Sequence, residues 1–374
     1  MVYIHIPFCK QKCSYCNFHF STSLRQKEDL LLALKKELML RAGELPMSEI
    51  SSLYFGGGTP SILTIAEIQQ LIDEVLKYYD FKPDIEITLE ANPDDLSPEY
   101  LKALAHTEVN RLSIGTQSFF DADLKLMNRV HNASQAEASI KRAQDTGFEN
   151  VSIDLIYGSP TSDMAIWRKN LEMAIALQVP HISSYALTVE AKTALQSWIA
   201  KAQVPAPKED FQNEAFHYLS ERLKAAGFIH YEISNFAQPD FYSKHNTAYW
   251  QYQPYLGIGP SAHSYNGAEQ RAWNVANNSL YLKSLAENQR PLETEILSEY
   301  EQFNERLMIG LRTIWGVDMK ALRQFLMIEN AEFQRNLNEK LSAGILEIKD
   351  DRLIIPERHW FMADGIAADL FVLP

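Results

Sequence analysis

The chain contains three cysteines, and all of them lie in one short segment, at Cys9, Cys13 and Cys16. Their spacing can place three thiolates around one face of a [4Fe-4S] cluster. Three ligands for four irons leave one iron without a protein ligand, and an amino acid could chelate that iron. An odd number of clustered cysteines does not fit a disulfide framework. A tetrahedral zinc site with His19 as its fourth ligand is the alternative interpretation.

Glycine and polar residues recur where predicted strands end. Residues 56–60 read Gly-Gly-Gly-Thr-Pro, which either brings bare backbone close to a ligand or makes a tight turn. Glu90 and Gln117 each end a predicted strand. Asp154 lies within an apolar run and needs a partner if it is buried, either a ribose diol or a structural arginine. Arg129 can grip a carboxylate with its planar guanidinium, unless it is a surface arginine.

A histidine is followed by aromatic residues at positions 245–250, which read His-Asn-Thr-Ala-Tyr-Trp. The imidazole of His245 can bind haem iron, and tyrosine and tryptophan offer flat faces to a porphyrin. The alternative interpretation is a packed or exposed loop histidine. His263 is a second candidate for a group near haem, with a structural turn as its alternative.

Short stretches rich in β-branched and aromatic residues alternate with longer stretches of helical periodicity. Six strands are predicted, at 2–6, 51–55, 85–90, 111–115, 151–156 and 181–187, with helical faces at 30–39, 65–75 and 166–177 between them. Since parallel neighbours need crossover helices, this order predicts a parallel α/β sheet. An open doubly wound sheet and an incomplete barrel both fit, and polar residues at several strand ends favour the barrel.

The pattern changes in the second half of the chain. A helix near 210–226 and one strand near 229–236 are followed by helices near 280–287, 298–311, 319–326 and 331–341. A hairpin at 345–355 and a last helix at 360–371 complete a small, winged-helix-like C-terminal domain. Its tail lacks a basic face, which favours a cap or a protein-docking surface over DNA binding.

Composition narrows the class of protein. The chain has 374 residues, 46% of them hydrophobic, and a formal net charge of −13. The negative charge argues against nucleic acid or an anionic membrane as the main partner. We find no apolar stretch long enough for membrane insertion and no signal peptide, so a cytoplasmic protein is expected.

The cysteine spacing just after a first strand resembles the radical S-adenosylmethionine (SAM) superfamily, whose core is a partial (β/α)6, TIM-like barrel. Most of the chain is similar to one branch of it, the oxygen-independent coproporphyrinogen III oxidases and their relatives. The resemblance implies a [4Fe-4S] cluster and SAM, with Arg129 on the methionine carboxylate and Asp154 on the ribose. The full set of implied SAM contacts is Tyr3, Tyr15, Gly57, Gly58, Thr59, Glu90, Gln117, Arg129 and Asp154.

Two departures from the oxidases matter. Phe18 stands where the oxidases have a fourth nearby cysteine, and Cys9 lies so near the start that their N-terminal segment is expected to be missing. The His-Asn-x-x-Tyr-Trp run and the Cys-x3-Cys-x2-Cys-x-Phe loop instead resemble haem chaperones of this branch. The resemblance implies haem binding through His245 and delivery to haem-accepting, for example respiratory, proteins.

Decarboxylation of coproporphyrinogen III is the alternative function and is not expected, whereas cleavage of SAM and homodimer formation are left open. The predicted division is a radical SAM core at 1–237, a linker with the haem-binding motif at 238–277 and an oxidase-like cap at 278–374.

Overall fold

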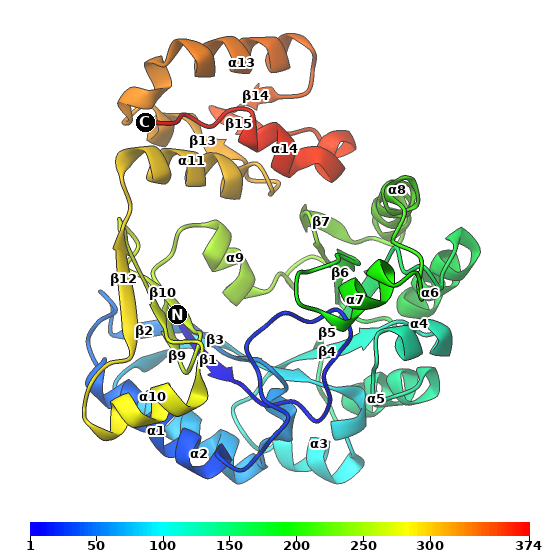
Figure 1. Ribbon diagram of the computed structural model, residues 1–374, viewed down its shortest axis with the longest axis vertical. Helices are drawn as coiled ribbons and strands as arrows, with labels where there is room; N and C mark the ends of the chain where they lie inside the picture. The colour runs from blue at the N-terminus through cyan, green and yellow to red at the C-terminus, as the bar shows by residue number, and fades with distance from the viewer.

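The protein, described over all 374 residues by a computed structural model, is built on one nine-stranded sheet (Figure 1). Six parallel strands lie side by side in chain order, and their bounds are β1 (Val2–Ile6), β2 (Glu49–Gly57), β3 (Asp80–Ala91), β4 (Arg111–Gln117), β5 (Asn150–Tyr157) and β6 (His181–Ala186). The predicted α/β fold with a partial barrel is confirmed.

Both edges of the sheet are extended by strands from later in the chain. β9 (Leu256–Ile258) pairs parallel with β1 and was not predicted. At the other edge, β8 (Asn235–Ala237) pairs antiparallel with β6 and with β7 (Ile229–Glu232). The single strand predicted near 229–236 is therefore wrong, because the chain reverses between β7 and β8. The Glu232 carboxylate accepts a hydrogen bond from the Ser234 N–H at 3.2 Å within this reversal.

Helices cover the outer face of the curved sheet. Those between the parallel strands are α1 (Lys27–Leu40), α2 (Ile65–Leu76), α3 (Pro98–Leu104), α4 (Asp121–Leu126), α5 (Ala133–Asp145) and α6 (Met164–Ala176), and α7 (Ala194–Ala200) and α8 (Glu209–Ala225) follow β6. Helix α2 shows why they form: Thr64 and Glu67 make a capping box at its start, and its apolar stripe is buried. The three predicted helical faces lie in α1, α2 and α6.

The alternation of residues along the strands creates a polar barrel interior. Successive side chains of a strand point to opposite faces, so Leu53 and Phe55 of β2 pack outward in the apolar core. Ser52 and Tyr54 of the same strand point inward and line a cavity or contact its wall. Glu90 of β3 lies on the same inner side. The barrel therefore presents hydroxyl and carboxylate groups to its interior.

The short helix α9 (Lys244–Trp250) lies between the two edges of the sheet, on the side where the barrel is open (Figure 1). It contacts β2 across the interior. After α9 the chain forms β9, then a small antiparallel sheet of β10 (His263–Tyr265), β11 (Gln270–Asn274) and β12 (Leu292–Ile296), with α10 (Asn278–Ala286) packed on α1.

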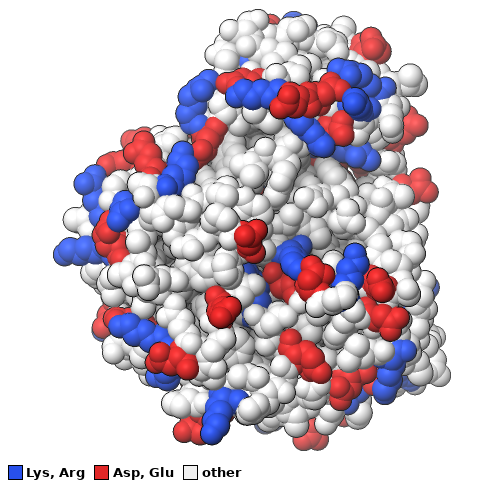
Figure 2. All heavy atoms as spheres, turned by 180° about the vertical axis from the view of Figure 1, so that it is seen from behind, with Lys and Arg blue, Asp and Glu red and all other residues white.

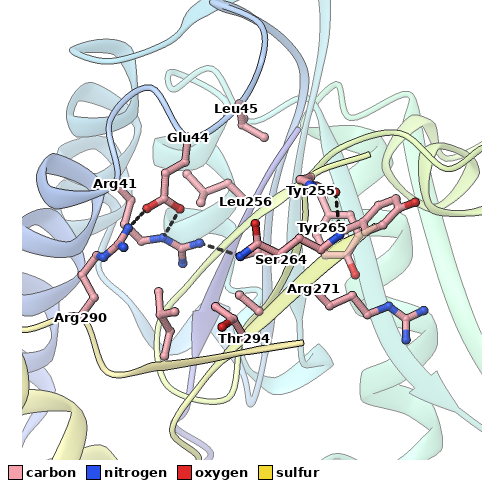
Figure 3. A pocket seen from close by; sticks show the side chains of 14 residues that line it. Arg41, Glu44, Leu45, Tyr255, Leu256, Ser264, Tyr265, Arg271, Arg290 and Thr294 are labelled. Atoms are coloured by element: carbon pink, nitrogen blue, oxygen red, sulfur yellow. Dashed lines mark hydrogen bonds and ion pairs between the residues drawn. The ribbon is translucent and has the colours of Figure 1, made fainter. Parts of the chain in front are cut away.

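A buried ionic cluster fastens this small sheet to α1 (Figure 3). Arg41 is 2% exposed, and its guanidinium donates to Glu37 at 3.0 Å, to Glu44 at 2.9 Å and to the Ser264 hydroxyl at 3.0 Å. Arg290 forms a further ion pair with Glu44. All five polar groups are paired, so the cluster has a structural role in holding the small sheet against α1.

The C-terminal part contains α11 (Glu299–Gly310), β13 (Val317–Asp318), α12 (Met319–Leu322), a 3₁₀ turn (Leu326–Glu329), α13 (Ala331–Ser342), the hairpin β14 (Glu347–Lys349) and β15 (Arg352–Ile354), a second 3₁₀ turn (Glu357–Met362) and α14 (Ala363–Ala368). The predicted hairpin is present. The helices predicted at 319–326 and 360–371 are wrong in length, since each is divided into a short α-helix and a 3₁₀ turn. The domain boundaries at 237 and 277 stay a prediction.

Charged side chains of both signs are interspersed over the C-terminal part on the face shown in Figure 2. Several of its arginines have acidic partners, such as Arg323 with Asp351 and Arg352 with Asp318. Nowhere does a helix combine the length and the apolar character needed to cross a bilayer.

Candidate cofactor and haem site

The cysteine loop follows β1 and is fastened to the opposite side of the barrel mouth. The Ser14 N–H donates to the Met127 carbonyl at 3.0 Å, and its hydroxyl donates to the Leu126 carbonyl at 2.7 Å. The Asn128 amide donates to the Lys12 carbonyl at 2.7 Å. These bonds place the loop beside the segment that carries Arg129.

Cys9, Cys13 and Cys16 are free, partly exposed thiols in this loop. No three His, Cys, Asp or Glu side chains are arranged to bind one metal ion. The three cysteine sulfurs therefore lie in one loop but do not point to a common position. Burial raises the pKa of Cys9 to about 11 and also raises the pKa of Cys16. Binding a metal cluster would therefore release protons from these thiols.

Two observations bear on the choice between a cluster and zinc. The Arg129 guanidinium donates to the Cys13 sulfur at 3.4 Å, which suits a site that gains negative charge when thiolates form. His19, the fourth ligand in the zinc interpretation, instead has its Nε2 2.7 Å from the Asn278 side-chain oxygen on α10. The arrangement fits a three-cysteine site better than a Cys₃His site.

The glycine turn after β2 is both a tight turn and a close backbone approach. The Gly58 N–H donates to Ile6 at 2.9 Å, and the Thr59 N–H donates to Phe8 at 2.7 Å. A Cβ on Gly58 would lie 2.6 Å from the Phe8 carbonyl oxygen. Gly57 has a φ of +108°, a conformation that favours glycine. The glycines of this turn therefore allow its backbone to contact the start of the cysteine loop at Phe8.

Arg129 is not a free surface arginine. Its guanidinium donates to the Asn92 side-chain oxygen at 2.6 Å and to the Gly115 carbonyl at 2.8 Å, so it joins the ends of β3 and β4 to the cysteine loop. Its Nε is buried and has no partner. Buried donors normally have an acceptor, and a ligand carboxylate would supply one at this place.

Glu90 and Asp154 face the barrel interior from β3 and β5. Glu90 accepts from the Tyr54 hydroxyl at 2.8 Å and from the Gly57 N–H at 3.2 Å. Asp154 accepts from the Ser113 hydroxyl at 3.5 Å, and no arginine bonds to it, so the structural-arginine alternative is not what the structure shows. Burial raises the pKa of Glu90 to about 7 and the pKa of Asp154 to about 6.

The raised pKa of Glu90 predicts a pH dependence of stability. The folded chain binds a proton at Glu90 between about pH 4.5 and pH 7, whereas the unfolded chain has lost it. The free energy of unfolding should therefore fall as pH rises through this window, by up to roughly 3 kcal/mol. In Glu90→Gln, which keeps an acceptor for Tyr54, that part of the fall should disappear. Urea denaturation of both proteins across the window measures the difference, and equal slopes would contradict it.

The remaining predicted contacts lie around the same mouth. Tyr3 of β1 bonds His5 Nδ1 through its hydroxyl at 3.0 Å and lines the interior cavity. Tyr15 packs on a small apolar cluster that includes Met127. Gln117 ends β4 with a φ of +65° and is buried. Such backbone conformations are uncommon outside glycine and often occur at ligand sites.

His245 lies on α9 inside the barrel and is 2% exposed. Its Nδ1 is 2.8 Å from the Ser52 hydroxyl, and its Nε2 is 3.0 Å from the Tyr249 hydroxyl. Burial lowers the pKa of His245 to about 3, so the imidazole is neutral, as a metal ligand must be. His263, on β10, is exposed and lies outside this cavity, with its ring centroid 6.0 Å from that of Trp273.

One cavity of about 260 Å³ lies inside the barrel. Its wall includes Tyr3, Glu90 and Asp154, which were predicted as SAM contacts, together with His245. The cysteine loop, the glycine turn and Arg129 lie beyond it, at the barrel mouth. Sequence reasoning missed Ser52, Tyr54, Glu86 and Asn92. Ser52 and Tyr54 are polar residues two positions apart in a predicted strand, so they lie on the same face of the sheet. This spacing could have been used to predict that this face lines the barrel interior.

The sequence of the chain is similar to those of known proteins over most of its length. The chain is 36% identical to the heme chaperone HemW of Lactococcus lactis over 96% of its own length and 91% of that protein. The chain belongs to the HemW family. The heme chaperone HemW of Bacillus subtilis is 36% identical, with 86% of each chain covered.

More distant comparisons agree with the fold of the HemW family. The model of the Radical SAM superfamily matches residues 3–174. The solved structure of coproporphyrinogen III oxidase (HemN) from Escherichia coli covers 99% of this chain and 89% of its own, with a TM-score of 0.85 at 24% identity. That likeness concerns the fold alone. Membership of the radical SAM superfamily implies a [4Fe-4S] cluster and SAM as cofactors.

Proposed function

We propose that this protein is a haem chaperone, which binds haem through His245 and passes it to haem-accepting proteins. The observation that carries the proposal is the placement of a neutral histidine in the cavity that also contains Glu90 and Asp154. The names of the HemW relatives support it. A cytoplasmic setting remains a prediction, and homodimer formation is left open.

The cofactor residues have separate roles in this proposal. Cys9, Cys13 and Cys16 would hold the [4Fe-4S] cluster, which when bound supplies one-electron reduction of SAM. Arg129 would bind the methionine carboxylate through its unpaired Nε–H. Asp154 would accept hydrogen bonds from the ribose, and Tyr3, Glu90 and the turn at Gly57, Gly58 and Thr59 would complete the pocket with Tyr15 and Gln117.

Haem titration of the anaerobically reconstituted protein tests the proposal. His245→Ala is expected to weaken haem binding by about tenfold or more, because the axial ligand is lost. His106→Ala, which removes an exposed histidine, is the matched control and should bind haem like the wild type. Absorption spectra in the haem region give the affinity.

Unchanged haem affinity in His245→Ala, with the fold intact by circular dichroism, would remove His245 from the site. Formation of protoporphyrinogen from coproporphyrinogen III in an anaerobic assay would instead support the alternative, oxidative decarboxylation. In that case the chain would share the chemistry of the oxidase whose fold it resembles.

A further inference from the structure

His245 is masked in the conformation described above. Both ring nitrogens have partners, Ser52 and Tyr249, and the side chain is buried. Iron ligation needs a free nitrogen and room for a flat macrocycle. The cavity of about 260 Å³ is smaller than the roughly 300–1,000 Å³ typical of small-molecule sites. Haem therefore requires another position of α9.

The first turn of α9 is held by a buried carboxylate from β3. Glu86 accepts hydrogen bonds from the backbone N–H groups of Lys244 and His245, each at 3.0 Å. The Ser243 hydroxyl also donates to Glu86, at 3.4 Å. A carboxylate at a helix N-terminus is favoured by the helix dipole. Together with Ser52 of β2, Glu86 ties α9 to the inner wall of the barrel.

The rest of α9 is poorly satisfied in this position. The side-chain atoms Asn246 Nδ2, Thr247 Oγ1 and Trp250 Nε1 are all buried without a hydrogen-bond partner. Such atoms are rare in folded proteins, and here three of them fall on one helix of seven residues. Exposure to water would provide their missing partners, which lowers the cost of moving the helix.

The connections on either side of α9 contain residues in the left-handed region. Asp240, before the helix, has a φ of +71°, and Tyr252, after it, has a φ of +57°. Tyr252 ends α9 in a Schellman motif, in which its N–H donates to the Tyr249 carbonyl at 3.2 Å and the Gln253 N–H donates to the Ala248 carbonyl at 3.0 Å. Aspartate tolerates the left-handed region better than most residues do. The two positions bound the segment that contains α9, so a change of backbone angle at both would swing the helix as a unit.

We propose that α9 is a latch, closed in this structure by Ser52 and Glu86, which must open before His245 can bind haem. The inference rests on the proposed function and concerns the regulation of the same site. A protein whose binding-competent state is only partly populated binds with an affinity reduced by that fraction. Weakening the closed state therefore strengthens haem binding, which is the reverse of what loss of a site residue does.

Ser52→Ala and Glu86→Gln test the latch. Ser52→Ala should bind haem about threefold to tenfold more tightly than the wild type, the equivalent of one lost hydrogen bond in the closed state. Glu86→Gln keeps an acceptor oxygen but removes the negative charge that faces the first turn of α9 and the Arg111 guanidinium at 3.9 Å, and it should shift haem affinity in the same direction. Hydrogen exchange of peptides covering residues 243–251, measured without haem, should be faster in both. Ser139→Ala, which removes a buried hydroxyl on α5 far from the cavity, is the matched control and should change neither quantity.

The results of these measurements distinguish the latch proposal for α9 from the proposed haem-binding function. Weaker haem binding in Ser52→Ala would show that Ser52 orients His245 for iron, and it would overturn the latch. Unchanged exchange and affinity in both variants, with normal His245-dependent binding in the wild type, would also overturn it and leave the function standing. If neither the wild type nor the variants bind haem but hydrogen exchange in α9 is faster in the variants, the haem assignment is overturned. The opening of α9 would then stand without haem as its ligand.

Discussion

A Cys13→Ser variant is expected to lose nearly all of the iron that the wild-type chain takes up on anaerobic reconstitution with iron and sulfide. Thiolates are the preferred ligands of iron–sulfur clusters, and a serine hydroxyl is a poor substitute. The chain has three cysteines in all, so no other thiol can replace the missing one. Iron and sulfide content per chain, together with the absorption spectrum, measures the loss.

Phe18→Ser provides the control within the same loop. Phe18 is 70% exposed and offers no iron ligand, so its replacement should leave iron uptake unchanged. Full iron content in Cys13→Ser would contradict the three-cysteine site. A colourless wild-type protein that takes up zinc instead would revive the zinc interpretation, with His19 as the ligand to test next.

Arg41→Met is expected to have the largest effect on stability, lowering the free energy of unfolding by about 3–5 kcal/mol. The substitution keeps much of the side-chain volume but removes the positive charge beside Glu37, which is 0% exposed. Glu37 would keep bonds from Asn274 at 2.7 Å and from Tyr281 at 2.6 Å, but neither partner carries a compensating charge. Chemical denaturation followed by circular dichroism measures the change.

Arg335→Met is the matched control because it breaks an ion pair with Glu332 that lies on the surface, with the Arg335 side chain 62% exposed. Pairs of this kind contribute about 0–1 kcal/mol, so the control should unfold nearly as the wild type does. An Arg41→Met protein as stable as this control would mean that the small sheet β10–β12 does not depend on the buried cluster for its attachment to α1.

Periodic elements were predictable from the sequence, and short, long-range ones were not. The strand at 2–6 was predicted with its observed ends, since Val2, Ile4 and Ile6 are apolar and buried. β9 has three residues, Leu256, Gly257 and Ile258, and its only strand partner is β1 at the start of the chain. Three residues carry too little pattern to predict a pairing over that distance.

The same difference applies to the site. The cysteine spacing and the polar strand ends are local patterns, and they led to residues that the structure gathers around one mouth and one cavity. The burial of His245 depends on Ser52 and Glu86, which lie far away in sequence. A single serine or glutamate in a strand does not indicate which distant helix it holds, so the closed position of α9 could not be predicted.

The position of Tyr54 links the two ligands that the cavity is proposed to serve. Its hydroxyl donates to Glu90, and its ring centroid lies 4.9 Å from that of His245. A group that binds beside Glu90 and shifts this ring changes the free energy of haem binding as well. Such coupling is reciprocal: whatever factor SAM imposes on the affinity for haem, haem must impose on the affinity for SAM. Loading and release of haem would then be set by the cellular supply of a second, chemically unrelated molecule.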